Sequence, residues 1–265
     1  MIRIVLKSLR TALRALEIVF ALVTFFLIAS VLEIALGKRL ASAPKGWLLL
    51  LVSRLTLWAY GVKVTTVGEP LRDPRSVLVS NHISFLDILV ISSRLPVRYI
   101  TSMEMREQWV GTLTELAGCL YTERRKKDPV STHKEIERVA LELRKTSAPI
   151  VLFAEGTSTV GETVLPFKGR FFESVVIAKV PVQTVCLQYI DEHGNKLIGQ
   201  DADRIAFYGD MSLGAHLKNL LLQDRTHCRL DWIEVLWPSP HLARSELKNL
   251  AHATVLARYK NESST

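Results

Sequence analysis

The feature that most constrains this chain is an uncharged apolar run close to its N-terminus. The 15 residues from Ile18 to Leu32 carry no charge, and Glu17 and Glu33 bound them. A helix needs roughly 20 apolar residues to cross the hydrocarbon core of a bilayer. The run is therefore short for a span unless flanking side chains reach the interface, and it fits a re-entrant or interfacial helix equally well.

A stripe of cations precedes the apolar run. Arg3, Lys7, Arg10 and Arg14 are spaced by four, three and four residues, which places them on one face of a helix. This pattern is typical of a basic amphipathic helix that lies on an anionic membrane surface. The alternative is an ordinary solvated charged face.

A second apolar stretch follows from Trp47 to Val52. Together with the first it predicts a helical hairpin docked in one leaflet. We therefore expect residues 1–60 to form a membrane-associated helical segment and residues 61–265 to form the rest of the protein.

From residue 62 onward, short apolar runs rich in β-branched residues alternate with helical patterns. This alternation predicts an α/β fold with a mixed sheet flanked by helices. The expected strands are Val62–Val67, Ser76–Ser80, Arg98–Thr101, Pro149–Phe153, Val182–Tyr189 and Arg229–Leu236. The expected helices are Ser84–Ser93, Glu104–Ala117, Ser131–Lys145, Arg170–Lys179, Ser212–Leu222 and Ser245–Tyr259.

The overall charge leaves three classes of partner open. A net charge of +8 suits nucleic acid, anionic lipid headgroups or acidic substrates. The basic residues are spread out and no aromatic platform is interleaved with them, which argues against nucleic acid. Cys119, Cys186 and Cys228 form no C-x-x-C pair, so we expect free thiols and neither a disulfide framework nor a zinc site.

The segment Ser76–Asp87 contains the first candidate for chemistry. A strand is expected to end at Ser80, so His82 lies at its carboxyl end, where open α/β sheets carry their sites. Ser84 is the expected N-cap of the next helix, and Asp87, three residues on, completes a capping box. Asp87 can also reach back to His82, and a histidine oriented by a carboxylate acts as a general base. The alternative is that Asp87 only caps its helix.

Polar residues follow a second buried strand. Glu155, Gly156 and Thr157 come directly after the expected strand at Pro149–Phe153, and Gly156 permits a tight turn there. Between the two sites, Gly118–Arg125 reads as another strand-like end followed by two arginines. Such basic side chains are suited to an anionic headgroup.

Taken together, these segments resemble the glycerophosphate acyltransferase superfamily, most closely its 1-acylglycerol-3-phosphate acyltransferase branch. Four blocks in a fixed order are typical of that family, and the resemblance covers roughly residues 60 to 190. The blocks are matched by Asn81, His82 and Asp87; by Gly118, Tyr121 and Arg124; by Phe153, Glu155, Gly156 and Thr157; and by Val180, Pro181 and Val182.

The resemblance implies transfer of a fatty acyl group from an acyl thioester to the free hydroxyl of a lysolipid. His82 would be the base and Asp87 its orienting partner, with no metal and no cofactor, and acyl-carrier protein or acyl-CoA would be the donor. The enzyme would work at a membrane with its active site facing the cytoplasm, on the inner membrane if bacterial. The residues expected to bind the acceptor are Arg124, Glu155, Gly156, Thr157, Ser158 and Lys168.

The identity of the acceptor lipid depends on one position at which this sequence departs from the family pattern. Ser158 stands where the family usually has an arginine associated with the substrate phosphate. The run from Phe153 to Lys168 also looks like the lyso-ornithine lipid acyltransferase branch, whose acceptor has an amino-acid headgroup and no phosphate. The second-block Arg124 favours 1-acylglycerol-3-phosphate, with Arg125, Lys168 and Arg170 as further phosphate partners, and lyso-ornithine lipid is the alternative.

This sequence lacks the motifs that are typical of other classes of enzyme. No G-x-S-x-G elbow supports an α/β lipase, and neither a P-loop nor a G-x-G-x-x-G fingerprint is present. A peripheral lipid-binding protein without catalysis would explain the basic N-terminus. It would not explain a paired His82 and Asp87 followed by Glu155-Gly156-Thr157.

Overall fold

The seven strands form one mixed sheet in the order β1-β7-β6-β2-β5-β3-β4. Neighbouring strands run parallel except β6 and β7, which are antiparallel. The computed structural model describes residues 2–108, 110–123, 128–223, 225–239 and 243–261. The strands are β1 (Val62–Val67), β2 (Val77–Ser80), β3 (Arg98–Ser102), β4 (Leu120–Thr122), β5 (Ile150–Phe153), β6 (Val182–Ile190) and β7 (Thr226–Leu236).

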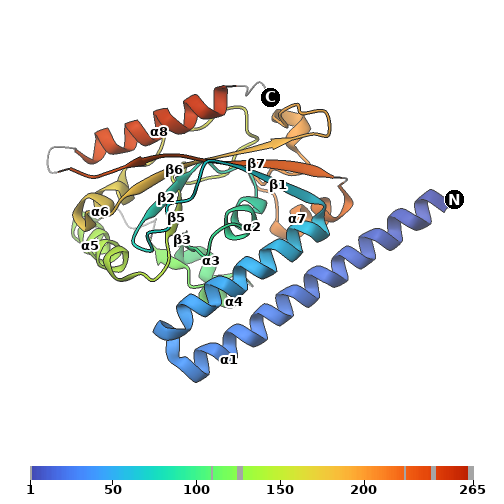
Figure 1. The fold of residues 1–265 in the computed structure, drawn as a ribbon, viewed down its shortest axis with the longest axis horizontal. Coiled ribbons are helices and arrows are strands. Elements are labelled where there is room, and N and C mark those ends of the chain that lie inside the picture. Colours follow the sequence, from blue (N-terminus) through green and yellow to red (C-terminus); the bar gives the residue numbers. More distant parts are fainter. Residues whose placement is uncertain (1, 109, 124–127, 224, 240–242, 262–265) are drawn as a thin grey trace.

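Helices cover both faces of the sheet, which confirms the predicted α/β class (Figure 1). The helices α6 and α8 pack together, with α5 beside α6, while α2 lies on the opposite face with α1 against it. The helices are α1 (Ile2–Tyr60), α2 (Leu86–Ser92), α3 (Met103–Glu107), α4 (Gly111–Leu116), α5 (Pro129–Lys145), α6 (Arg170–Ala178), α7 (Leu213–Leu222) and α8 (Arg244–Lys260), with a 3₁₀ turn at Gly199–Ala202.

The central strands are buried on both faces because helices cover the sheet on both sides. All four residues of β2 are buried, as are all residues of β6 except the last. These strands form the main core together with the inward faces of the helices.

The predicted helix Glu104–Ala117 is wrong in one respect, because it is two short helices, α3 and α4. The backbone is extended at Gln108, which ends α3. A Cβ atom added at Gly111 would lie 2.0 Å from the carbonyl oxygen of Arg106. The chain therefore folds back on itself at a position that only glycine can occupy. The short strand β4 lies within the segment Gly118–Arg125, which the sequence indicated as strand-like.

The N-terminal helix α1 folds into a hairpin (Figure 1). Gly37 breaks the helix with φ 74° and ψ 159°, a conformation that glycine adopts without strain. Ala21, Phe25 and Ala29, spaced four residues apart, are buried with Val52 of the second arm. By length and composition α1 is apolar enough to cross a membrane, and it leaves large apolar side chains such as Phe20 exposed.

The basic stripe does not lie entirely on the outer face of the hairpin. Arg14 is only 9% exposed and donates hydrogen bonds to the carbonyl oxygens of Leu221 and Gln223, at the end of α7. The expectation that Arg14 faces a membrane surface is therefore wrong. A helix C-terminus presents unpaired carbonyl groups, and Arg14 satisfies two of them while it docks the first arm onto the sheet domain.

Candidate active site

The candidate site lies where β2 and β5 end side by side. Ser80 of β2 pairs in register with Phe153 of β5. Because the two strands are parallel, the loops that begin with Asn81 and Ala154 leave the sheet at the same edge. The Asn81 side chain accepts from and donates to the backbone of Leu187 on β6, at 2.8 and 2.9 Å, and fixes the start of the first loop.

His82 and Asp87 form the predicted pair. The distance from His82 Nδ1 to Asp87 Oδ2 is 2.8 Å, and the Asp87 side chain is fully buried. The same oxygen accepts the backbone N–H groups of Ile83 and Ser84, at 2.6 and 2.9 Å. Tyr189 donates its hydroxyl to Asp87 Oδ1 at 2.7 Å. Four donors thus hold the carboxylate in a single orientation.

The ring of His82 is oriented for proton transfer. Phe153 stacks on it with ring centroids 4.0 Å apart and an angle of 11° between the planes. Since Asp87 is the acceptor at Nδ1, that nitrogen carries the proton and Nε2 presents a lone pair. Nε2 makes no hydrogen bond with any residue in the described ranges, and the side chain is 19% exposed. This arrangement suits a general base.

Ser84 has a structural role at the start of α2. The helix begins at Leu86, so the residue before it is Phe85 and not the predicted cap Ser84. Ser84 Oγ nevertheless accepts from the Leu86 N–H at 3.1 Å and donates to the carbonyl oxygen of Ile205 at 2.5 Å. Its proton points to a backbone carbonyl and not to His82, so Ser84 does not form a Ser-His-Asp triad with His82 and Asp87.

Glu155 braces the loop that carries His82. Its two carboxyl oxygens accept the backbone N–H groups of His82 and Leu165, each at 2.7 Å, and the residue is 2% exposed. Both oxygens therefore face the backbone, whereas we expected them to face the acceptor headgroup. Burial raises the pKa of the Glu155 carboxyl to about 7, against the opposing effect of the two N–H donors.

The raised pKa predicts how Glu155 affects stability. Because the folded protein holds this proton more tightly than the unfolded chain, the contribution is fully present below about pH 4.5 and is lost as pH rises through about 7. The maximum change is about 3 kcal/mol. We expect the melting temperature of wild type, measured in neutral detergent, to fall relative to that of Glu155→Gln as the pH is raised from 5 to 8. A constant difference over this range would contradict the assignment.

Gly156 and Lys168 lie together at the entrance to the second loop. Gly156 has φ +72°, and a Cβ atom added there would lie 2.8 Å from Lys168 Cδ and Nζ. The backbone N–H of Lys168 donates to the Ala154 carbonyl at 2.8 Å, which closes the loop. The Lys168 side chain is exposed and lies against the backbone of Gly156, which carries no side chain. This position suits a cation that binds a headgroup.

The remaining predicted acceptor residues differ in their surroundings. Thr157 is exposed, whereas the Ser158 hydroxyl donates to the carbonyl oxygen of Phe207. Arg170 is engaged elsewhere, in an ion pair with Glu135 at 2.6 Å. The predicted residues Arg124 and Arg125 lie outside the described residues.

Sequence reasoning missed two residues that hold the His82–Asp87 pair. Tyr189 is 102 residues from Asp87 in sequence, and burial followed by the Asp87 charge raises the pKa of its hydroxyl well above the ordinary value, so it remains a donor. A buried tyrosine needs a hydrogen-bond partner for its hydroxyl. The presence of Tyr189 in a strand expected to be buried therefore indicated that a polar group lies near it. Phe153 appeared only as part of a motif, and its stacking on His82 had no sequence signal.

Comparisons with known proteins agree with this geometry. Residues 63–188 match the family model described as Acyltransferase. A lyso-ornithine lipid O-acyltransferase of Pseudomonas aeruginosa is 32% identical over 76% of this chain and 77% of its own length. A 1-acyl-sn-glycerol-3-phosphate acyltransferase of Neisseria meningitidis is 27% identical over 72% of each chain.

A solved structure shares the fold. The crystal structure of the 1-acyl-sn-glycerophosphate acyltransferase PlsC from Thermotoga maritima superposes with a TM-score of 0.66. The match covers 98% of this chain and 100% of that one, at 16% sequence identity. At this identity the likeness concerns the fold alone, including the helices that precede the sheet.

Proposed function

The chain belongs to the acyltransferase family and transfers an acyl group to a lysolipid, and we propose that its preferred acceptor is a lyso-ornithine lipid. The observation that carries the acyl-transfer chemistry is the 2.8 Å contact between His82 Nδ1 and Asp87, with Nε2 left available as the base. The observation that carries the acceptor is the neutral Ser158.

In the proposed mechanism the acceptor hydroxyl is the nucleophile. His82 Nε2 removes its proton as the oxygen attacks the carbonyl carbon of the acyl thioester. The new C–O bond gives a tetrahedral oxyanion, and its collapse breaks the C–S bond. The leaving thiolate takes the proton back from His82, while Asp87 stabilises the transient imidazolium. Acyl-carrier protein or acyl-CoA supplies the thioester.

The charges around the second loop favour an acceptor with a single anionic group. A phosphomonoester carries nearly two negative charges and is best held by arginine. Ser158 supplies no charge, and Arg170 is paired with Glu135. Among described residues of this loop, Lys168 is then the cation available to a headgroup, which suits one carboxylate. The 32% identity to the Pseudomonas enzyme supports the same choice.

The second candidate acceptor is 1-acylglycerol-3-phosphate, which the sequence motifs favoured. The position of Lys168 over Gly156 is the observation in its support, since a lysine beside bare backbone also suits a phosphate. The Neisseria relative acts on this acceptor by its name.

Substitution at position 158 distinguishes the two acceptors. We expect wild type to have the higher kcat/KM on lyso-ornithine lipid. Ser158→Arg should shift the ratio toward 1-acylglycerol-3-phosphate by roughly tenfold or more, because each well-placed charge contact contributes on the order of 1.5–3 kcal/mol. Ser158→Ala loses the same hydrogen bond to Phe207 without adding charge, and its ratio should stay near that of wild type. A wild-type preference for 1-acylglycerol-3-phosphate would reject the proposed acceptor and keep the acyltransferase assignment.

The location of the enzyme is also part of the proposal. The exposed apolar side chains of the α1 hairpin support attachment to a membrane, where lysolipid acceptors reside. We place the active site on the cytoplasmic side, where acyl thioesters are made, and on the inner membrane if the source is bacterial.

A further inference from the structure

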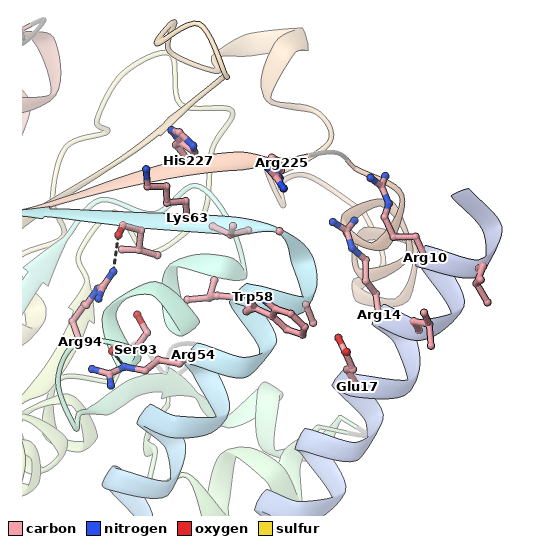
Figure 2. A pocket seen from close by; sticks show the side chains of 17 residues that line it. Arg10, Arg14, Glu17, Arg54, Trp58, Lys63, Ser93, Arg94, Arg225 and His227 are labelled. Atoms are coloured by element: carbon pink, nitrogen blue, oxygen red, sulfur yellow. Dashed lines mark hydrogen bonds between the residues drawn. The ribbon is translucent and has the colours of Figure 1, made fainter. Parts of the chain in front are cut away.

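A cavity of about 940 Å³ lies apart from the His82–Asp87 pair, between the two arms of α1 and the first residues of β1 and β7 (Figure 2). None of the residues assigned above to catalysis or acceptor binding lines it. We call it the basic cavity, because its lining holds six lysine or arginine side chains and one acidic side chain. These are Arg10, Arg14, Arg54, Lys63, Arg94 and Arg225, with Glu17 as the acid.

Neutral partners hold two of these cations in place without cancelling their charge. Arg54 Nε donates to the carbonyl oxygen of Ser93 at 2.8 Å, and Arg94 Nη2 donates to that of Val64 at 2.6 Å. Burial, and after it the charge of Arg54, lowers the pKa of the Arg94 guanidinium. Two like charges thus lie close together, an arrangement that an anion would stabilise.

Two further cations are free to bind a ligand. Lys63 on β1 and Arg225, directly before β7, are exposed, and Figure 2 shows both on the sheet side of the cavity, across from Arg54. Among the residues that the structure describes, Arg54, Lys63, Arg94 and Arg225 have no carboxylate within ion-pair distance. These four side chains therefore bring positive charge to the cavity that is not paired with a carboxylate of the described residues.

The rest of the lining contains polar Ser93 and His227 and a set of apolar side chains. Leu9 and Leu13 come from the first arm of α1, and Leu57 and Trp58 from the second. Trp58 is 70% exposed. The exposed apolar face of the hairpin continues from here through Phe20, so a ligand in the cavity has access to apolar surface along α1.

We propose that the basic cavity binds the headgroup of one anionic phospholipid of the surrounding membrane. Arg54, Lys63, Arg94 and Arg225 would hold the phosphate, and the acyl chains would lie against the leucines and Trp58 and leave along the hairpin. A free phosphate would leave the apolar side chains of the lining without a ligand contact. An acidic protein would match the charge of the cavity but would supply no acyl chain for the apolar surface that continues along the hairpin. The bound lipid would join the hairpin to the sheet domain, because both contribute to the cavity.

Trp58 provides a probe that does not depend on turnover. The full chain in neutral detergent micelles would be titrated with dibrominated phosphatidylglycerol or dibrominated phosphatidylcholine, and fluorescence quenching followed. The same titration of Trp58→Phe isolates the Trp58 signal. We expect half-maximal quenching at a several-fold lower mole fraction of the anionic lipid, with the difference reduced at high salt.

Two double variants test the charges. Lys63→Gln with Arg225→Gln removes two cavity cations that make no intramolecular hydrogen bond in the described structure, and it should abolish the preference for phosphatidylglycerol. Lys134→Gln with Lys145→Gln removes two exposed cations from α5 and should retain it. Lys63→Gln alone should reduce the preference part of the way, and acyl transfer in neutral detergent should persist in all of these variants.

Several results would overturn the proposal. One is half-maximal quenching of wild type at the same mole fraction of both lipids. Another is an unchanged preference for phosphatidylglycerol in the double variant Lys63→Gln with Arg225→Gln. Displacement of the brominated lipid by millimolar inorganic phosphate would assign the cavity to a soluble anion. Displacement by an acidic carrier protein would assign it to a protein partner. None of these outcomes depends on the acceptor or on the acyl-transfer assignment.

Discussion

Replacement of His82 by alanine is expected to reduce kcat for acyl transfer by at least about 10³-fold, because it removes the proposed general base that deprotonates the acceptor. The ring is partly exposed and carries no backbone hydrogen bond, so its loss should leave the fold intact. The measurement is the initial rate of lysolipid acylation by purified protein in detergent. His133→Ala removes an exposed histidine of α5 and should keep the wild-type rate. A His82→Ala enzyme that works within tenfold of wild type would show that His82 is not the base.

Asp87→Asn is expected to lower kcat by roughly 10³- to 10⁴-fold, because a neutral amide no longer stabilises the imidazolium that forms on His82. The amide is close in shape to the carboxylate, and its one oxygen can still accept from Ile83 and Ser84. The loss should therefore appear in the rate of the chemical step, with the KM for the lysolipid little changed.

Tyr189→Phe is the matched control for the Asp87 variant. It removes a single hydrogen bond to Asp87 Oδ1 and leaves the contact with His82 in place. Its loss of rate should be about tenfold, well below that of Asp87→Asn. Equal losses in the two variants would mean that Asp87 acts through packing and not through its charge.

The His82–Asp87 pair was predictable because it is local. The two residues are five apart, and the turn that starts α2 brings them together by backbone geometry alone. The strands around them were also predictable, since β2, β5 and β6 are runs of strand length that are rich in apolar and β-branched residues. The sequence pattern thus defined the edge of the sheet at which the chemistry takes place.

Contacts between distant segments could not be predicted in the same way. A motif identifies Glu155 as a residue of the site, but only the fold shows that its carboxyl oxygens face the backbone of His82 and Leu165. Helical spacing puts Arg14 on one face with other cations, yet it does not say that this face meets the end of α7. The break between α3 and α4 follows from a close backbone approach at Gly111, which periodicity does not report.

We expect the acceptor hydroxyl to attack the thioester directly, without an acyl-enzyme intermediate. The decisive measurement incubates purified protein with an acyl thioester, with and without lysolipid, and records thiol release, ester formation and the intact mass of the protein. Direct attack gives one thiol released for each ester formed, thiol release only when the lysolipid is present, and no change in protein mass. An acylated protein, or consumption of the donor with no ester formed on any lysolipid, would rule out direct transfer.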